Sequence, residues 1–252
     1  MLGRKPGIEY KGEDIKKGAK ILVQLMKQSA NTVVLTGAGM DTESDIPDFR
    51  GKNGLWRNMD PRLVASIDSF YENYELFHEF YSARIKLLED IKPHDGHYIL
   101  ANFERQGIIK SIATQNVSGL HHMAGNKKVY ELHGNIKRVK CNQCNHEAEL
   151  KDFLSKKNCN KCGNLLRPGV VLFGEALPND VWALAENDIN KCDLLIVIGT
   201  SLEVYPVNQF PKIANGKTAF LNNEDVSFDH EFDIKIIGKA KEILQELNAR
   251  VK

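Results

Sequence analysis

The stretch Val33-Val34-Leu35-Thr36-Gly37-Ala38-Gly39 decides the fold of this chain. Its apolar, β-branched start is typical of a buried strand, and the glycines directly after it predict a tight turn. Because glycine has no Cβ, its backbone can approach a phosphate group closely. The pair taken alone also fits an ordinary turn, since Thr42 occupies the third glycine position of the G-x-G-x-x-G fingerprint. Both interpretations stay open until the rest of the chain is considered.

Length and composition limit the class of protein. The 252 residues are enough for one large domain with a smaller one attached. The net charge of +1 argues against direct binding of nucleic acid, because nucleic-acid-binding domains carry a strong basic excess. No apolar run approaches the roughly 20 residues of a membrane helix, and residues 1–14 lack the apolar core of a signal peptide. We therefore expect a cytoplasmic protein that does not enter a membrane.

Strand-like and helical patterns alternate along the chain. Ile15, Ala19, Leu22, Val23 and Met26 have helical spacing and predict an amphipathic helix over 13–28. Besides 33–36, further strands are predicted at 108–114, 129–132, 170–173, 194–198 and 218–221. Further helices are predicted at 94–105, 179–190 and 207–214. This alternation predicts an α/β fold with a parallel sheet covered on both faces.

Two segments interrupt the alternation. Residues 52–89 are helical in pattern and rich in Phe and Tyr, and residues 139–166 hold four cysteines. We interpret both as insertions that together form a smaller domain, 52–89 and 139–166. The sheet domain would then consist of residues 1–51, 90–138 and 167–252.

The four cysteines, Cys141, Cys144, Cys159 and Cys162, are spaced C-x2-C-x14-C-x2-C. Two such pairs favour a tetrahedral zinc site, and two unrelated pairs of free thiols are the alternative. Four thiolates leave no position for water, so we expect the zinc ion to be structural rather than catalytic. The fifth cysteine, Cys192, is expected in the core.

Three further motifs carry a resemblance to a known family. They are Ser44-Asp45-Ile46-Pro47-Asp48-Phe49-Arg50-Gly51, Thr114-Gln115-Asn116-Val117-Ser118-Gly119-Leu120-His121 and Tyr130-Glu131-Leu132-His133-Gly134-Asn135. With the strand–glycine stretch and the paired cysteines, they resemble the motifs of the sirtuins, which are NAD-dependent protein lysine deacylases. The resemblance runs from about residue 15 to residue 247. It implies a Rossmann-like, NAD-binding domain, a smaller zinc-binding domain, an acyl-lysine protein or peptide as partner, and a monomer.

The resemblance also implies a set of cofactor-binding residues. In this family the glycine segment cradles the pyrophosphate, the arginine at Arg50 contacts phosphates or ribose, and the aromatic at Phe49 shields the reacting ribose carbon. The clusters at 199–201 and 222–224 each follow a predicted strand, where open α/β sheets bind ligands. The full set is Gly37, Ala38, Gly39, Thr42, Asp48, Phe49, Arg50, Trp56, Gln115, Asn116, Val117, Ser118, Gly199, Thr200, Ser201, Asn222, Asn223, Glu224 and Ala240.

The same resemblance implies that His133 and Asn116 are catalytic. An imidazole has an unperturbed pKa near 6.5 and can take up a proton near neutral pH. The chain has eight histidines, and only the H-G-N motif distinguishes His133 from a structural or surface histidine. The implied reaction transfers the acyl group from lysine to the ribose as nicotinamide leaves, and His133 removes a proton from a ribose hydroxyl. Asn116 would hold the ribose or a water, and Gln115 would orient the ribose hydroxyls.

Substrate contacts are implied at the stretches 171–178 and 201–206, between which the family adds its substrate as an extra strand. Strand addition binds mainly through main-chain hydrogen bonds and therefore tolerates many peptide sequences. Either stretch could instead be an ordinary sheet edge. The implied residues are Val171, Phe173, Gly174, Glu175, Leu202 and Val204.

Tyr81 and Arg84 resemble the Y-x-x-R pair of sirtuins that remove acidic acyl groups. A guanidinium matches a carboxylate bidentately, and a phenol adds a donor. The alternative is an ordinary helical arginine with an aromatic neighbour, and Thr42 stands where that subclass has alanine. Acetyl is therefore the expected acyl group, with succinyl or malonyl as the alternative.

Three residues depart from the family pattern. Ser118 stands where Asp is usual, which removes a charge-assisted acceptor for nicotinamide worth about 1.5–3 kcal/mol. Asp41 replaces a usual serine and Asp45 a usual glycine; both carboxylates would repel a pyrophosphate unless they point away from it. These departures keep two other functions open. One is ADP-ribosyl transfer or NAD hydrolysis, and the other is a weakly active sensor of NAD or ADP-ribose.

Overall fold

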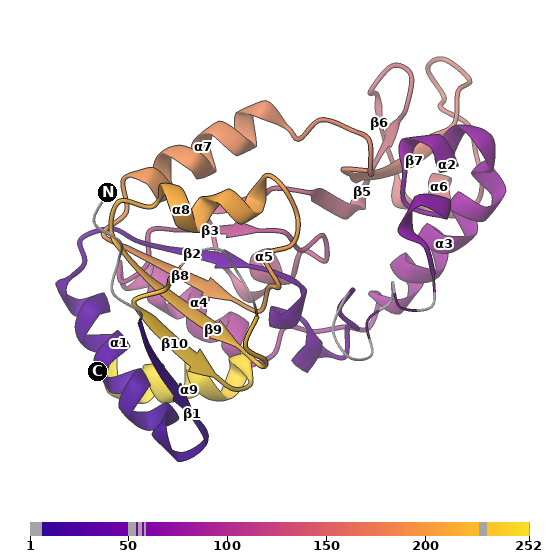
Figure 1. Ribbon diagram of the computed structural model, residues 1–252. Coiled ribbons are helices and arrows are strands. Elements are labelled where there is room, and N and C mark those ends of the chain that lie inside the picture. Colours follow the sequence, from indigo (N-terminus) through magenta and orange to yellow (C-terminus); the bar gives the residue numbers. More distant parts are fainter. Residues whose placement is uncertain (1–6, 50–53, 55–56, 58, 227–230, 252) are drawn as a thin grey trace.

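The computed structural model describes residues 7–49, 54, 57, 59–226 and 231–251 (Figure 1). Its main layer is a seven-stranded sheet in the order β1-β10-β9-β8-β2-β3-β4, and all neighbouring strands are parallel. The strands are β1 (Ile8–Lys11), β2 (Thr32–Thr36), β3 (Ser111–Thr114), β4 (Val129–Glu131), β8 (Leu194–Ile198), β9 (Lys217–Asn222) and β10 (Ile234–Ile237). The predicted α/β fold with a parallel sheet is confirmed.

Helices cover both faces of this sheet, so every residue of β2 and β8 is buried. Figure 1 places α1 (Ile15–Gln28), α4 (Asp95–Arg105) and α9 (Ala240–Val251) together on one face, and a shared apolar cluster joins them to the sheet. On the other face lie α7 (Asn179–Asn190), the 3-10 turn η6 (Val207–Gln209) and α8 (Phe210–Ile213). The apolar stripe predicted for the helix over 13–28 is therefore the packed face of α1.

Most predicted elements agree with the structure to within a few residues. The strand at 194–198 and the helix at 179–190 have the predicted bounds, and 207–214 divides into η6 and α8. The predicted strand 108–114 begins only at Ser111. The predicted strand 170–173 is wrong, because β7 (Leu166–Val170) ends where it was expected to begin. Beyond Val170 only an isolated bridge between Ser66 and Phe173 remains.

A second, three-stranded sheet forms a separate module at one end of the molecule (Figure 1). It consists of β6 (Glu147–Ala148), β5 (Gly134–Cys141) and β7 and packs against α2 (Ile67–Glu72), α3 (Tyr74–Leu87) and α6 (Leu150–Leu154). This sheet spans residues 134–170, which extends on both sides of the predicted insertion 139–166. The division of the chain into two domains stays a prediction. None of the described helices has both the length and the hydropathy needed to cross a membrane.

The order of the large sheet brings particular loops together. From β2 the chain proceeds to β3 and β4 on one side, whereas β8, β9 and β10 lie on the other side. The direction of winding therefore reverses at β2, and the loops that follow β2, β3 and β8 leave the same edge of the sheet side by side. A crevice at the carboxyl ends of the strands is the usual ligand site of such sheets.

Candidate active site

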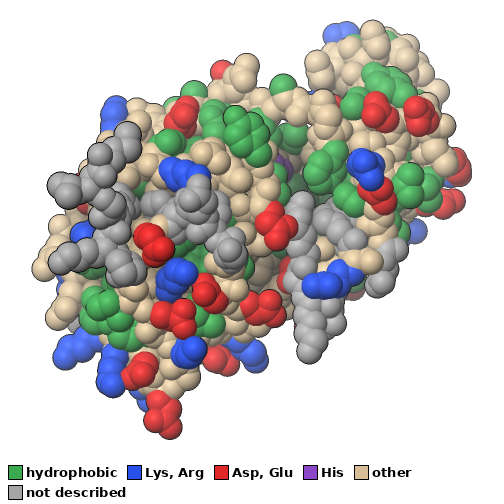
Figure 2. Space-filling view, viewed as in Figure 1, with side chains coloured by type: hydrophobic (Ala, Val, Ile, Leu, Met, Phe, Trp, Pro, Cys, Tyr) green, Lys and Arg blue, Asp and Glu red, His purple; other side chains and the backbone are tan. Residues whose placement is uncertain are grey.

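One large cavity, of about 1360 Å³, lies at this edge, between the large sheet and the three-stranded module. Figure 2 shows the hollow between the two masses of the molecule, with hydrophobic side chains along its rim. The predicted site residues that line it are Ala38, Gly39, Thr42, Asp48, Phe49, Tyr81, Arg84, Gln115, Asn116, Val117, His133, Val171, Phe173, Gly174, Glu175, Gly199, Thr200, Ser201, Val204, Asn222, Asn223, Glu224 and Ala240.

Three of the described residues that were predicted for the site are not among those that line the cavity. Gly37 and Ser118 are buried behind it, and Leu202 is 2% exposed and packs into the core beneath the sheet. Leu202 adopts a left-handed backbone conformation with φ of 55°, which turns the chain there. Arg50 and Trp56 lie outside the described residues.

The glycines after β2 are required by a close approach between two loops. A Cβ on Gly37 would lie 2.6 Å from the Cβ of Thr200, and a Cβ on Gly39 would lie 2.9 Å from the Cα of Gly199. The N–H of Gly39 donates to the carbonyl of Gly199 at 2.7 Å. The structure therefore directly supports the interpretation of this glycine pair as a tight turn. A phosphate-binding role is compatible with the same geometry.

The end of β3 connects the neighbouring loops. Gln115 Nε2 donates to Thr200 Oγ1 at 2.9 Å, which ties the β3 loop to the β8 loop. Asn116 is buried and donates through Nδ2 to the carbonyl of Gly37 at 3.0 Å. Its own N–H donates to Thr114 Oγ1 at 3.0 Å. Both amides are therefore held in fixed positions at the wall of the cavity.

His133 lies half-buried between β4 and β5 and lines the cavity. Its Nδ1 lies 3.1 Å from the carbonyl oxygen of Gln115. A carbonyl oxygen can only accept, so Nδ1 carries the proton in this hydrogen bond and Nε2 of the neutral ring is the basic nitrogen. Gly134 follows with φ of 75°, and a Cβ there would lie 2.0 Å from the carbonyl oxygen of Gly169. This close approach of β5 and β7 fixes the turn that presents the imidazole.

Arg84 on α3 enters the cavity from the side of the small module. Its guanidinium carbon lies 5.0 Å from the ring centre of Phe49 and 5.7 Å from that of Phe80. Burial lowers the pKa of Arg84, yet an arginine remains charged in proteins. Tyr81, one turn earlier, is 6% exposed, and burial raises the pKa of its phenol. Within the described part of the chain, Arg84 forms no ion pair with a carboxylate.

Asp41 and Ser118, two of the residues that depart from the family pattern, meet behind the cavity. Ser118 Oγ donates to Asp41 Oδ2 at 2.7 Å, and Asp41 Oδ1 lies 3.1 Å from Nε2 of His97. Both side chains are buried, and neither lines the cavity. A carboxylate from the loop after β2 thus contacts the hydroxyl at position 118. Asp41 points away from the cavity, whereas Asp45 lines it and is exposed.

Three buried imidazoles pack beside this pair. The ring of His97 lies 4.4 Å from that of His94 and 5.0 Å from that of His121. His94 holds the loop after β2, since its Nε2 contacts the carbonyl of Met40 at 2.7 Å. Burial, and secondarily His97, lowers the pKa of His121 to about 3, so this ring is neutral at pH 7. The cluster is therefore a rigid polar support for the loop after β2.

The hydrogen bond between Ser118 and Asp41 leads to a testable prediction. Ser118→Asp alone would place two carboxylates together in a buried site, and we expect it to destabilise the fold by about 3–5 kcal/mol, as other uncompensated buried charges do. Asp41→Ser alone would remove the partner of His97. The double variant Asp41→Ser/Ser118→Asp restores one carboxylate and one hydroxyl, so we expect it to recover most of the lost stability. Urea unfolding of all four proteins measures the coupling. Additive effects of the two substitutions would contradict the pairing.

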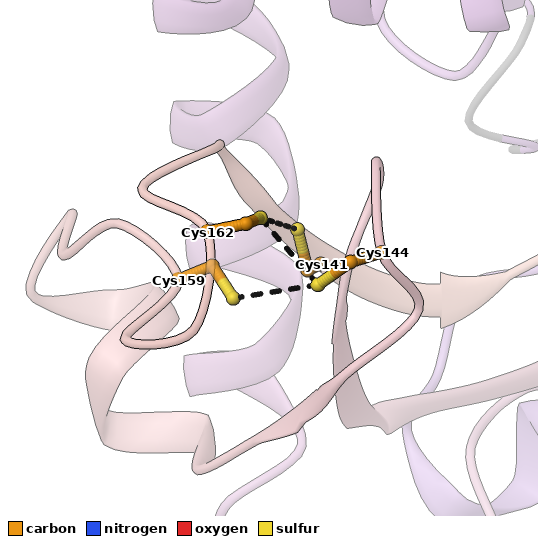
Figure 3. Close-up of side chains that lie close together, drawn as sticks. All are labelled: Cys141, Cys144, Cys159 and Cys162. Atoms are coloured by element: carbon orange, nitrogen blue, oxygen red, sulfur yellow. Dashed lines mark hydrogen bonds between the residues drawn. The ribbon is translucent and has the colours of Figure 1, made fainter.

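The four cysteines of the predicted metal site converge in the small module (Figure 3). Cys141 ends β5 and Cys144 lies in the turn after it, and Cys159 and Cys162 come from the loop before β7. Their Sγ atoms lie within 4.8 Å of one another, with close pairs at 3.4 and 3.7 Å. Zinc–sulfur bonds of about 2.3 Å in a tetrahedron would place neighbouring sulfurs about 3.8 Å apart.

The environment of these thiols also suits a metal. N–H donors at Asn164 lower the pKa of Cys162 to about 6, which favours the thiolate that a metal ion needs. At Cys144 the backbone hydrogen bond from His146 acts in the same direction, but burial and the neighbouring thiols outweigh it and raise the pKa to about 12. The four thiols therefore fit one zinc ion with no position left for water or substrate. As predicted, Cys192 lies apart from them and is buried in the core.

Sequence reasoning missed several residues of the site. Trp182 on α7 lines the cavity and stacks on Phe210 at 4.4 Å between ring centres. Glu43 also lines it and accepts from the N–H of Lys241 at 2.7 Å, which attaches the loop after β2 to the first turn of α9. No local pattern marks these residues. By contrast, the helical spacing of Ile243, Leu244 and Leu247 could have indicated α9 itself.

Comparison with known proteins agrees with this geometry. The model of the Sir2 family matches residues 37–206. An NAD-dependent protein deacetylase of Oceanobacillus iheyensis is 45% identical over 84% of this chain and 91% of its own. An NAD-dependent protein deacylase of Archaeoglobus fulgidus is 41% identical over 95% of this chain and 97% of its own.

Solved structures give the same result. A mutant Sir2 homologue in complex with ADP-ribose superposes with a TM-score of 0.88 at 37% identity and covers 92% of this chain and 95% of its own. A Sir2 protein with a deacetylated peptide and 3′-O-acetyl-ADP-ribose superposes with a TM-score of 0.86 at 36% identity, covering 90% and 96%. The chain belongs to the Sir2 family.

Proposed function

We propose that this chain is an NAD-dependent protein lysine deacylase. One observation carries the proposal: a single cavity gathers His133, the amides of Gln115 and Asn116, and the polar strand-end clusters at 199–201 and 222–224. Cavities of this kind, with a basic group among convergent polar groups, are the default location of an active site. The names of the curated relatives, which include both deacetylases and deacylases, support the same reaction class.

In this proposal His133 acts as the general base. The hydrogen bond from Nδ1 to Gln115 sets the tautomer, so that Nε2 accepts a proton from a ribose hydroxyl. Asn116 holds the ribose or a water near that hydroxyl, and Gln115 supports it from the β3 loop. NAD supplies the ribose that receives the acyl group and releases nicotinamide. The four thiols of the small module would bind a structural zinc ion and take no part in the chemistry.

The remaining cofactor residues keep the roles proposed from the sequence. The loop from Ala38 to Thr42 would contact the pyrophosphate, and Phe49 would shield the reacting ribose carbon. Both roles are supported by the position of these residues at the cavity wall. The stretch 171–175 and Val204 would pair with the substrate peptide. We further propose a monomer in the cytoplasm, as the composition and the resemblance to the family suggest.

A product assay tests the proposed reaction. Purified protein is incubated with NAD and an acetyl-lysine peptide, and the products are followed by mass spectrometry. Deacetylated peptide, nicotinamide and O-acetyl-ADP-ribose in equal amounts are expected. ADP-ribose formed without an acyl product would instead indicate NAD hydrolysis or ADP-ribosyl transfer. Binding of NAD without any product would indicate a sensor.

Arg84 favours acidic acyl groups as a second substrate class. A charged guanidinium at the cavity wall, packed on two aromatic rings and without an ion-pair partner among the described residues, suits a bidentate carboxylate. We expect the enzyme to accept succinyl-lysine, and Arg84→Met to lower kcat/KM for that substrate about 10- to 100-fold, since a charged hydrogen bond is worth about 1.5–3 kcal/mol.

The two acyl groups serve as each other's control. The Arg84→Met variant keeps an unbranched side chain that can still pack near the aromatic rings, so activity on the acetyl peptide should change little. Equal losses on acetyl and succinyl peptides would assign Arg84 to packing. No activity of the unaltered enzyme on the succinyl peptide would limit the substrate to acetyl-lysine.

A further inference from the structure

The segment 171–175, which we proposed as the edge for the substrate peptide, lies outside every helix and strand. It is nevertheless held along its length by main-chain hydrogen bonds. Val171 N–H donates to the carbonyl of His133 at 2.9 Å. Phe173 N–H donates to the carbonyl of Ala65 at 2.9 Å, and its own carbonyl accepts from Ile67 at 3.0 Å. These bonds fix the direction of the segment, while its turn at Gly174, with φ of 90°, needs another support.

That support is the guanidinium of Arg167 on β7, which is 1% exposed. Two of its N–H groups donate to the carboxylate of Glu175, at 2.5 and 2.8 Å. The others donate to the carbonyls of Val170 at 2.6 Å and Pro168 at 3.3 Å and to Asn142 Oδ1 at 3.2 Å. An arginine has five N–H donors, and each of these has an acceptor. A buried charge is tolerated only with such a complete set of partners.

Glu175 closes the turn on this guanidinium. Its Oε2 also accepts from the N–H of Leu172 at 2.8 Å, and its own N–H donates to the carbonyl of Leu172 at 3.0 Å. Burial would raise the pKa of Glu175, but the hydrogen bonds from Arg167 and Leu172 outweigh it and lower the pKa overall. The carboxylate is therefore charged at neutral pH, and the turn between Leu172 and Glu175 is clamped at both ends.

The same guanidinium contacts the cysteine cluster. Asn142, its fifth acceptor, lies directly after Cys141 in the first cysteine turn. The N–H of Asn142 donates to the carbonyl of Leu165 at 3.1 Å, and its Nδ2 donates to the hydroxyl of Tyr71 at 2.8 Å. The cysteine turn, β7 and the segment 171–175 are thus joined through one side chain.

We propose that Arg167 is a positioning residue for the peptide-binding edge, and that it joins the order of this edge to the metal-binding turn. This inference rests on the proposed function. A peptide that adds as a strand binds more tightly to an edge that is already ordered, because binding then costs no conformational entropy of that edge. Arg167 contacts neither the cavity nor the reacting atoms, so its effect is confined to how tightly the peptide backbone is held.

The test compares Arg167→Lys with the unaltered enzyme on two substrates. Lysine keeps the charge but cannot form the fork to Glu175. For an acetylated peptide with several residues on each side of the lysine, we expect KM to rise about tenfold with kcat within about twofold. For acetyl-lysine with blocked termini, which has no flanking main chain to pair, we expect KM to be unchanged. KM for NAD and the zinc content should also stay within about twofold.

Arg138→Lys is the matched control, because Arg138 lies in the same small sheet but its side chain is 71% exposed, and lysine can keep its ion pair with Glu131. It should leave every parameter unchanged. Parallel losses on the peptide and on the blocked amino acid in Arg167→Lys would reduce Arg167 to a structural role and overturn the proposal, as would an unchanged peptide KM.

Two further variants keep the proposal testable if Arg167→Lys does not fold. Glu175→Gln retains the shape of the clamp and weakens its charge, so the peptide KM should rise about threefold, again without effect on the blocked amino acid. Asn142→Ala removes only the link to the cysteine turn and should raise the peptide KM in the same selective way. If neither variant raises the peptide KM selectively over that of the blocked amino acid, the proposal is refuted. A total absence of deacylation by the unaltered enzyme would refute the proposed function instead.

Discussion

Replacement of His133 by alanine is expected to lower kcat for deacylation by about 10²–10⁴-fold, the usual contribution of a general base. The dissociation constant for NAD should change by no more than about twofold. The reason is that the imidazole is presented by the turn between β4 and β5, whereas the loops after β2 and β8 supply other residues of the cavity lining. The main-chain bond from Val171 to the carbonyl of residue 133 persists in the variant, so the peptide edge should stay in place.

His122→Ala is the control for this prediction. His122 is 40% exposed and lies 3.7 Å from Glu131, on the helix that begins after the β3 loop. Its removal should leave kcat unchanged. The two variants are compared by the rate of O-acyl-ADP-ribose formation, measured by mass spectrometry, and by calorimetry with NAD. Formation of this product by the His133 variant at an undiminished rate would exclude His133 as the base.

Loss of the metal is expected to have the second large effect. Cys162→Ser removes one of four thiolates at an exposed position, so it costs little packing. We expect the zinc content to fall from one ion per chain to less than about a tenth. Because structural zinc contributes several kcal/mol or more to folding, the melting temperature should fall by about 10 °C or more. Peptide turnover should fall with it, since α3, which packs on this module, and the segment that follows β7 both line the cavity.

The matched control is Cys192→Ala, which removes a thiol that lies in the core apart from the four others. It should keep a full complement of zinc, measured by plasma emission spectrometry, even if packing lowers its stability slightly. Equal zinc contents in Cys162→Ser and the unaltered protein would show that Cys162 is not a ligand. Unchanged melting temperature after complete loss of zinc would show that the ion does not support the fold.

Local sequence patterns were enough to predict the central elements of the sheet. The apolar runs of β2 and β8 mark strands that are buried on both faces. The apolar stripe of α1 marks a helix that is buried on one face, because burial of one face imposes a period on the sequence. The edge strand β1 escaped this method because only Tyr10 in it is buried. The predicted strand 170–173 failed because an apolar run does not reveal which sheet will pair with it, and β7 joined the small sheet instead.

By itself the sequence determined the parallel α/β fold, the spacing of the four thiols and the strand-end position of His133, all of which depend on residues close together in the chain. Only the tertiary structure decided which distant residues meet. Asp41 and Ser118 lie 77 residues apart, yet they touch because β2 and β3 pair in parallel register and their loops leave the same edge. Arg167 is completed by Glu175 and by Asn142, which lies 25 residues earlier in the chain. A contact between loops depends on strand order and register, and no local pattern of apolar and polar residues encodes either.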